Sequence, residues 1–317
     1  MSSKNAIEVK NVYCHFGEVK ALDGVSITAM KGKVTGLLGP NGAGKSTLIK
    51  IMTTLLEPNS GEVIVDGVDV LGDPTTTRER IGLAGQSAAV DDFLTGREIL
   101  HMVGRLYHMP KDIVEKRAIN LLDKLGLTEA ADRQVKTYSG GMRRRIDLGA
   151  SLVATPKVLF LDEPTTGLDP RTRLQLWDII REMVASGVSI LLTTQYLEEA
   201  DALADYLYVI DHGKLISEGT SEQLKSRLGQ DVIEIKVADG KLNSATSILK
   251  ANFKQKVIVD DLTRRITLRT KDGSDDLLKV AQLLKDKKIK TEELSLHRPS
   301  LDDVFLAITG KSTGEKQ

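Results

Sequence analysis

The chain has 317 residues, with 44 Lys and Arg against 44 Asp and Glu, so its formal net charge is zero. This balance argues against DNA or RNA as the main partner, because proteins that bind nucleic acid usually carry a basic excess or a basic face. A single cysteine, Cys14, excludes an internal disulfide and suits a reducing cytoplasm. The apolar runs are strand-length, whereas crossing a bilayer takes about 20 residues, so any action on a membrane is expected through a partner.

Segments with strand and helix character alternate from the N-terminus to residue 228. Residues 7–12 and 61–70 are rich in β-branched residues and end in turn residues, which predicts an antiparallel β subdomain. A short apolar strand over 34–38 leads into a glycine-rich loop and then into a helix over 47–56. These segments predict the start of an α/β domain over residues 1–228.

The middle of this domain changes character. Residues 92–150 carry few strand signals, and apolar residues recur at helical spacing over 113–125, so a helical subdomain is predicted at about 92–150. Two buried strand patterns follow at 158–161 and 189–193. Each leads into a helix, as a core built on a parallel sheet requires.

A second, smaller domain is predicted over residues 231–309. Residues 232–237 alternate like a strand, and the chain then indicates a helix, a hairpin, a second helix and a last strand near 293–296. The order β-α-β-β-α-β predicts a ferredoxin-like α+β domain. The polar residues 310–317 are expected to form a disordered tail.

The loop after the strand over 34–38 fits the pattern G-x-x-x-x-G-K-[ST] in full, between a predicted strand and a predicted helix. Glycines let the backbone curl so that N–H groups and the helix N-terminus face phosphate oxygens. Lys45 is expected to reach the β- and γ-phosphates of ATP, and Ser46 to ligate Mg²⁺. The predicted nucleotide-binding residues of this loop are Gly39, Pro40, Asn41, Gly42, Ala43, Gly44, Lys45, Ser46 and Thr47.

Two carboxylates, Asp162 and Glu163, follow the buried strand pattern over 158–161. Open α/β sheets bind ligands at the carboxyl ends of their strands. Asp162 is therefore predicted to hold Mg²⁺ or its water, and Glu163 to orient and deprotonate the attacking water. An Asp-Glu pair alone is more often the start of a solvated loop, but the nearby phosphate loop favours the catalytic interpretation.

Further segments resemble motifs of the ATP-binding-cassette family, in the family order over residues 5 to about 225. Gln86 looks like the Q-loop glutamine, which the resemblance assigns to the metal. Asp169 ends a segment similar to the D-loop, a dimer contact, and Phe16 matches the place of the aromatic that stacks on adenine. Residues 138–142 resemble the signature motif, whose nucleotide-binding residues would be Ser139, Gly140, Gly141 and Met142.

Each of these residues also has an ordinary structural interpretation. Ser139 is a good helix N-cap, and Asp169 before Pro170 is an N-cap with proline at the first helical position. Phe16 is nearly as well explained as a core aromatic, and Gln86 has the alternative of a polar loop residue. For the two caps both interpretations can hold, because an exposed helix N-terminus also offers donors to a phosphate.

The resemblance implies a division of labour between two chains. The phosphate loop of one cassette would hold MgATP, and the signature of a second cassette would cover its γ-phosphate. One chain carries one cassette with both the phosphate loop and Glu163, so a symmetric homodimer with two competent sites is expected. Phosphoryl transfer depends on positioning and charge stabilisation, and an incomplete half-site should be nearly inert.

One position departs from the family pattern. Gln195 occupies the switch region, where most cassettes carry histidine. An amide can donate a hydrogen bond to the γ-phosphate but cannot carry a charge or relay a proton. We therefore expect Glu163 to be the base and Gln195 to assist as a neutral donor.

Segments 138–142, 193–201 and 300–305 look most like daunorubicin-resistance-type exporter ATPases. This resemblance implies an ATPase motor for drug, lipid or glycan efflux, peripheral on the cytoplasmic face of the cell membrane, with a separate membrane permease and no nucleic acid as partner. Two alternatives stay open. One is a nucleic-acid- or ribosome-associated ATPase. The other is a weakly hydrolysing regulatory nucleotide-binding module, which is suggested by Gln195 in place of the switch histidine.

Overall fold

The computed structural model describes residues 4–86, 89–226, 231–253, 257–270, 272–297 and 299–309. The chain separates into two compact units, Met1–Ser221 and Glu222–Gln317. The boundary predicted at 228–231 remains a prediction, because residues 227–230 lie outside the described residues. The tail expected over 310–317 also lies outside them.

The first unit begins with an antiparallel sheet in the order β2-β1-β4-β5. It confirms the β subdomain predicted around 7–12 and 61–70, whereas β2 was not predicted, because Asp23 and Gly24 interrupt its apolar alternation. The strands of this sheet are β1 (Asn5–Phe16), β2 (Val19–Met30), β4 (Ser60–Val65) and β5 (Val68–Asp69).

A second sheet of six strands has the order β10-β9-β3-β8-β7-β6. Neighbours from β9 to β6 pair in parallel, and β10 pairs antiparallel with β9. The strands predicted at 34–38, 158–161 and 189–193 all lie in this sheet. Its strands are β3 (Val34–Leu38), β6 (Ile81–Ala84), β7 (Val158–Asp162), β8 (Ser189–Thr194), β9 (Tyr206–Asp211) and β10 (Lys214–Gly219).

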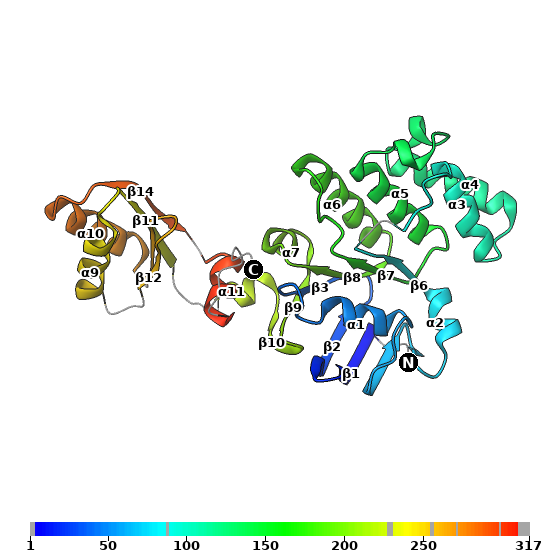
Figure 1. Ribbon diagram of the computed structural model, residues 1–317, viewed down its shortest axis with the longest axis horizontal. Coiled ribbons are helices and arrows are strands. Elements are labelled where there is room, and N and C mark those ends of the chain that lie inside the picture. The colour runs from blue at the N-terminus through cyan, green and yellow to red at the C-terminus, as the bar shows by residue number, and fades with distance from the viewer. Residues whose placement is uncertain are drawn as a thin grey trace. The chain divides into compact units, whose positions relative to one another are not determined.

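Helices cover both faces of the parallel sheet, so consecutive residues of β7 enter different cores. Figure 1 shows helices on either side of this sheet. Phe160 packs in the core shared with β1, β2 and α1 (Lys45–Met52), while Leu159 and Leu161 pack in the core shared with the helices of this unit from Gly96 onward. The helices of this unit are α1 (Lys45–Met52), α2 (Pro74–Arg80), α3 (Gly96–Leu106), α4 (Lys111–Lys124), α5 (Gly140–Leu152), α6 (Pro170–Ala185) and α7 (Leu197–Leu203), with 3₁₀ turns Thr128–Ala130 and Val135–Thr137.

The helix predicted over 47–56 is α1, which begins two residues earlier and ends four residues earlier. It stops there because Thr54 takes a left-handed conformation, with φ 65°. The helical subdomain predicted at about 92–150 contains α3, α4 and α5. None of the helices in the described ranges is both long and apolar enough to cross a membrane.

The second unit confirms the predicted ferredoxin-like order, with an antiparallel sheet arranged β12-β13-β11-β14. Helix α11 was not predicted. From the junction of the two units onward the elements are α8 (Ser221–Ser226), β11 (Asp231–Val237), α9 (Leu242–Asn252), β12 (Val257–Asp260), β13 (Arg265–Thr270), α10 (Gly273–Asp286), β14 (Thr291–His297) and α11 (Leu301–Thr309).

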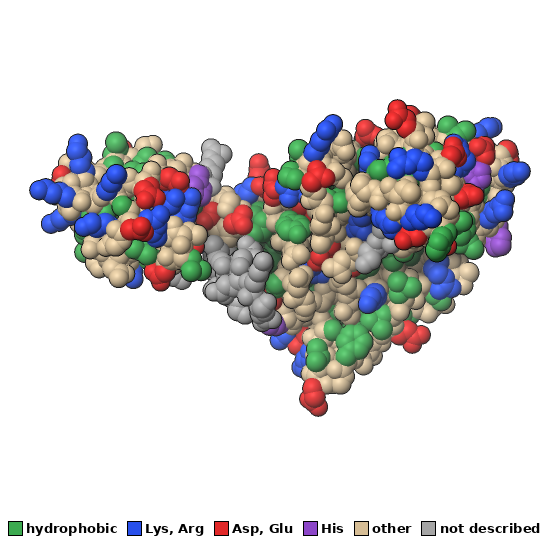
Figure 2. Space-filling model, turned by 45° about the horizontal axis from the view of Figure 1, so that its top comes forward, with side chains coloured by type: hydrophobic (Ala, Val, Ile, Leu, Met, Phe, Trp, Pro, Cys, Tyr) green, Lys and Arg blue, Asp and Glu red, His purple; other side chains and the backbone are tan. Residues whose placement is uncertain are grey.

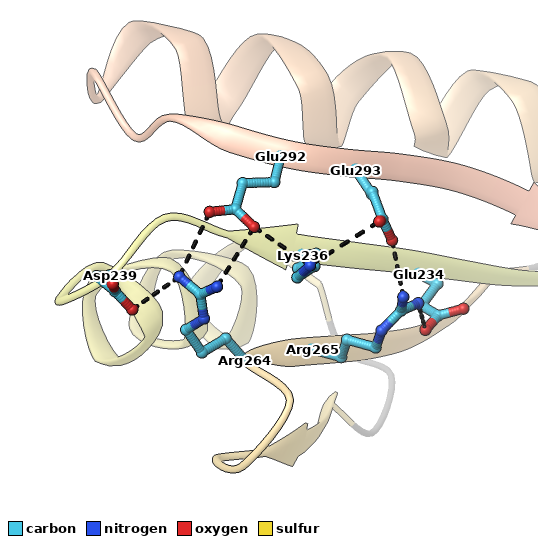
Figure 3. Close-up of polar contacts among 7 residues, drawn as sticks. All are labelled: Glu234, Lys236, Asp239, Arg264, Arg265, Glu292 and Glu293. Atoms are coloured by element: carbon cyan, nitrogen blue, oxygen red, sulfur yellow. Dashed lines mark hydrogen bonds and ion pairs between the residues drawn. The ribbon is translucent and has the colours of Figure 1, made fainter.

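The two faces of this small sheet differ in chemistry. Ile233, Ile235 and Ile266 are fully buried in a core with α9 and α10. Alternate residues carry charges, and Figure 3 shows how they pair across β11, β13 and β14. Arg265, for example, lies 2.8 Å from a carboxylate oxygen of Glu293 and also contacts Glu234. Period-two alternation therefore places the apolar residues under the helices and the ion pairs on the opposite face.

Neighbouring residues of β13 test this assignment. Ile266→Ala should lower the free energy of unfolding of the second unit by roughly 2–5 kcal/mol, because it empties a buried site. Arg265→Ala should change it little, because solvent screens its ion pairs. Chemical denaturation followed by circular dichroism measures both variants. The only tryptophan, Trp177, lies in the first unit, so its fluorescence transition is an internal control. Equal losses for the two variants would contradict the assignment.

Candidate functional site

The predicted phosphate loop lies at the carboxyl end of β3 and is tightly packed. A Cβ on Gly39 would lie 2.2 Å from the carbonyl oxygen of Ile210, and a Cβ on Gly44 would lie 2.4 Å from that of Ala21. Gly44 also has φ 107°, a conformation that side chains oppose. Glycine is therefore required at both positions, and the loop curls directly into the N-terminus of α1. This is the backbone arrangement that binds phosphates.

Lys45 begins α1 and is only 4% exposed. Its Nζ donates hydrogen bonds to the carbonyl oxygens of Gly39 (2.8 Å) and Pro40 (3.0 Å), and it lies 3.3 Å from Glu163 Oε1. Burial lowers the pKa of Lys45, while the carboxylates of Glu163 and Asp162 oppose that shift. The lysine ammonium thus lies between the phosphate loop and the two carboxylates.

Asp162 ends β7 and is held by hydroxyl groups. Thr193 Oγ1 donates to Asp162 Oδ1 at 2.5 Å, and Ser46 Oγ donates to the same oxygen at 3.2 Å. Thr193 is the register partner of Asp162 in the parallel pairing of β7 with β8. The sheet therefore brings a residue from α1 and a residue from β8 to one carboxylate.

Glu163 lies at the centre of the predicted catalytic residues and is 4% exposed. Its backbone has φ 48°, a left-handed conformation that is uncommon for a residue with a side chain. Its backbone N–H donates to the carbonyl and the hydroxyl oxygen of Thr193, both at 3.1 Å. Its Oε2 accepts from Gln86 Nε2 at 3.1 Å and from Thr166 Oγ1 at 3.3 Å. Gln86 and Thr166 thus orient the carboxylate, while Thr193 holds the backbone of Glu163.

The oxygen ligands that magnesium prefers meet at Ser46 and Asp162. Magnesium is usually held by one or two protein oxygens together with phosphates and water. Within the described ranges, no group of three His, Cys, Asp or Glu side chains is arranged to hold a metal by itself. The pair therefore fits a cation that arrives with a nucleotide. Gln86 contacts Glu163 through its amide nitrogen, which does not ligate metals, so its predicted metal role stays a prediction.

Gln195 follows β8, between the strand ends that carry the phosphate loop and the carboxylates. The carbonyl oxygen of Thr194 accepts a hydrogen bond from Gly39 N–H at 3.3 Å, which ties the switch region to the phosphate loop. Thr194 Oγ1 accepts from Tyr196 N–H at 2.9 Å and turns the chain into α7. Gln195 itself is half-buried. Because β8 pairs with β7, the predicted switch residue and the predicted base follow the ends of neighbouring strands.

The signature residues and Asp169 lie together at the N-termini of α5 and α6. Ser139 caps α5 by accepting from Met142 N–H at 3.3 Å, and Asp169 caps α6 by accepting from Thr172 N–H at 3.0 Å. A Cβ on Gly141 would lie 2.6 Å from the Thr172 side chain, so the two helix starts touch. Ser139 and Asp169 are both exposed. No hydrogen bond among the described residues joins either of them to the phosphate loop.

Phe16 is 52% exposed at the end of β1, which rules out the core-aromatic interpretation. It pairs with Val19 across the β1–β2 hairpin. Two residues after Val19, Ala21 is the residue against which Gly44 packs. An exposed ring therefore stands on a hairpin that borders the phosphate loop.

Sequence reasoning missed Thr193 and Thr166 as functional residues. Both lie within motifs that the sequence identified, but only their hydrogen bonds to Asp162 and Glu163 show what the hydroxyls do. A threonine at the end of a buried strand is also an ordinary β-branched residue. The pairing of β7 with β8 brings Thr193 to Asp162, 31 residues away in the sequence, and this contact favours the functional interpretation.

A buried carboxyl group lies behind the switch region on α7. Glu199 has no exposed surface, and its Oε1 accepts from Trp177 Nε1 at 3.3 Å. Burial raises the pKa of Glu199, and the neighbouring polar side chains of Thr194, Thr165 and Trp177 and the charge of Arg173 only partly oppose this shift. This group is thus protonated at higher pH in the folded chain than in the unfolded chain.

The fold and this site define an ATP-binding cassette: a phosphate loop between β3 and α1, paired carboxylates at the end of β7, and a capped signature helix. The chain matches the ABC transporter family over residues 22–166. It matches the C-terminal domain of DrrA1-3-like ATP-binding proteins over residues 219–309.

Similar proteins cover nearly the whole chain. The daunorubicin resistance ATP-binding protein DrrA2 of Streptomyces coeruleorubidus is 46% identical, over 97% of this chain and 96% of its own. The Nod factor export ATP-binding protein I of Sinorhizobium fredii is 38% identical, over 96% of this chain and 86% of its own. This chain belongs to the ATP-binding proteins of ABC transporters, in the daunorubicin-resistance group.

Solved structures give the same fold. One ATP-binding subunit of an ABC transporter is 27% identical with a TM-score of 0.65, over 71% of this chain and 93% of its own. A cassette solved in its ADP conformation is 31% identical with a TM-score of 0.63, over 70% of this chain and 93% of its own. The ABC cassette predicted from the motifs is therefore confirmed.

Replacing the buried glutamate should remove a pH-dependent loss of stability. The folded pKa of Glu199 lies above its unfolded value of about 4.3, so the native state keeps a proton that the unfolded state releases. Stability therefore falls as pH rises between these two values. Glu199→Gln lacks this loss of stability. The free energy of unfolding of the variant minus that of wild type should therefore increase above pH ~4 and become constant above the folded pKa of Glu199.

Denaturation at a series of pH values measures this difference. Glu198→Gln, next along α7 with a side chain that is 68% exposed, is the matched control and should show no comparable trend. A difference for Glu199→Gln that stayed constant from acid to alkaline pH would contradict the assignment.

Proposed function

We propose that this protein is an ATPase subunit that hydrolyses MgATP with Glu163 as the base and drives a separate membrane permease for export. The observation that carries the proposal is the convergence of Lys45, Ser46, Asp162 and Glu163 where β3 and β7 end. Lys45 would bind the β- and γ-phosphates, where the phosphate charge meets its ammonium. Ser46 and Asp162 would hold the magnesium ion, which supplies charge stabilisation to the phosphoryl group.

Glu163 would deprotonate the attacking water, and its surroundings support that role. Gln86 and Thr166 fix one carboxylate oxygen, and Lys45 lies beside the other. A base needs such orientation, because a water must be held in line with the phosphorus atom. Gln195 would donate a hydrogen bond to the γ-phosphate as a neutral group.

Two copies of the chain would complete each site. Ser139 and Asp169 are exposed side by side and free to face a neighbour, and Phe16 is exposed for a base to stack on. In a head-to-tail homodimer, the signature residues of one copy would cover the γ-phosphate held by the other. Since this chain has the phosphate loop, the base and the signature, both sites of such a dimer would be competent.

The membrane partner would bind the helical subdomain near Gln86, on the cytoplasmic face of the membrane. Phe93 and Leu106 of that subdomain are 72% and 70% exposed and offer apolar contact area. The names of the relatives, which refer to drug resistance and Nod factor export, support an export role. Crosslinking from Phe93 to the permease tests the contact.

Nucleic acid is the weaker candidate partner. On the face drawn in Figure 2, Lys and Arg side chains are interspersed with Asp and Glu side chains. A surface of mixed charge does not provide the basic footprint that phosphate backbones require. One observation still favours the alternative of a weakly hydrolysing regulatory nucleotide-binding module, which is Gln195 in place of the switch histidine.

Glu163→Gln should leave ATP binding intact and slow turnover by roughly 10²–10⁴-fold, because only the proton acceptor is lost. The variant should also trap an ATP-bound dimer, visible as a doubling of mass in size-exclusion chromatography with light scattering. Steady-state phosphate release measures the rate. Wild-type turnover in this variant would show that another group is the base.

Lys45→Ala should abolish tight ATP binding, because no other cation among the described residues lies within the phosphate loop. Titration with ATP and magnesium measures the affinity. Lys50→Ala is the matched control, since Lys50 lies one turn and a half further along α1 and is exposed. Unchanged affinity in Lys45→Ala would rule out the phosphate-loop assignment.

A further inference from the structure

Arg144, on the signature helix α5, has its guanidinium buried against the strand that carries the predicted base. Its Nε donates to the carbonyl oxygen of Pro164 at 2.8 Å, and its Nη2 donates to those of Asp162 (3.1 Å) and Glu163 (3.2 Å). Its Nη1 donates to the carbonyl oxygen of Gly85. One side chain thus binds three successive carbonyl oxygens, beginning at the last residue of β7, and the carbonyl oxygen of the residue directly before Gln86.

The three arginines at the start of α5 contact different parts of the chain. Arg143 pairs with Asp92 at the surface, and Arg145 Nη1 donates to the carbonyl oxygen of Leu125 at 2.8 Å within the helical subdomain. Of these three, only Arg144 contacts the end of β7 and Glu163. Its position in the sequence gives no sign of this, because a basic triplet is usually solvated.

The contacts suit a guanidinium and no other side chain. A planar fork with five N–H donors can serve several carbonyl oxygens at once, whereas an ammonium is a point donor. Asp147 lies 3.7 Å from Arg144 and accepts a hydrogen bond from Ala89 N–H at 3.0 Å. Arg144 and Asp147 together therefore bind the chain on both sides of Gln86.

The bound carbonyls explain the unusual backbone of the predicted base. Glu163 has φ 48°, and a non-glycine residue keeps such a conformation only where its surroundings fix it. Arg144 holds the carbonyls of Glu163 and of both its neighbours, which fixes the peptide planes around it. The side chain of Glu163 is thereby directed toward Lys45 and Gln86.

We propose that Arg144 is a positioning residue that joins the signature helix to the base and to Gln86 as one mechanical unit. Ser139 and Arg144 are five residues apart on α5, about 7–8 Å along the helix axis. A displacement of the exposed end of α5 is therefore transmitted to the backbone that orients Glu163. The proposal rests on the proposed function, in which Glu163 is the base.

The test compares Arg144→Lys with Arg145→Lys, a partly buried neighbour on the same helix. Arg144→Lys should lower kcat about 10–100-fold, since displacing a reacting group by about 1 Å costs rate on this scale. KM and the ATP affinity should stay close to wild type, because the phosphate loop is not touched. Arg145→Lys should keep wild-type kcat. Steady-state phosphate release and ATP titration on the full chain give these values.

Hydrogen–deuterium exchange supplies a readout independent of activity. In Arg144→Lys, peptides covering 81–86 and 158–166 should exchange faster, while the rest of the chain matches Arg145→Lys. General destabilisation would instead raise exchange throughout the first unit. Wild-type kcat in Arg144→Lys, or exchange indistinguishable from that of Arg145→Lys, would overturn the proposal.

Asp147→Asn provides a second variant if Arg144→Lys does not fold. It keeps an oxygen for Ala89 N–H but removes the charge beside the guanidinium, so the same two segments should loosen less and kcat should fall less. No change in either readout would also overturn the proposal. A wild-type chain that hydrolyses no ATP would refute the proposed function, and the exchange experiment would still decide whether Arg144 holds these segments.

Discussion

Lys45 and Glu163 form an ion pair in which each side chain is only 4% exposed. Two buried charges are stable together only when hydrogen bonds surround both of them. The carbonyls of the phosphate loop serve the lysine, and Gln86 and Thr166 serve the carboxylate. The end of β3, the start of α1 and the end of β7 therefore lie close together, because these segments carry the pair and several of its hydrogen-bonding partners.

The parallel sheet sets these distances through its register. Asp162 lies opposite Thr193, and the next carbonyl of β8, that of Thr194, accepts from Gly39 N–H. A shift of one residue in either pairing would turn Asp162 or Thr193 to the opposite face of the sheet. The buried apolar residues of β7 and β8 therefore do more than stabilise the core, because their packing on both faces fixes which polar groups meet at the strand ends.

Local patterns predicted the parts of the molecule that depend on local physics. The phosphate loop, the strand before Asp162 and the β-α-β-β-α-β order were predicted because glycine placement, apolar runs and alternation act within a few residues. The roles of Thr193, Arg144 and Glu199 were not predictable, since each depends on a partner at least 18 residues away. Strand β2 was missed because Asp23 and Gly24 interrupt its alternation, although buried and exposed residues alternate again from Val25 onward.

The placement of Arg144 bears on how the two sites of a homodimer would communicate. In the proposed dimer, Ser139 of one copy covers a nucleotide held by the other copy, while Arg144 on the same helix orients the base of its own copy. A nucleotide in one site would then shift the base of the other site through α5. Such coupling must be reciprocal, because the free energy that links two binding events is the same in either direction. On this argument, binding or release of nucleotide at one site would change the nucleotide affinity of the other site, and α5 would transmit the change.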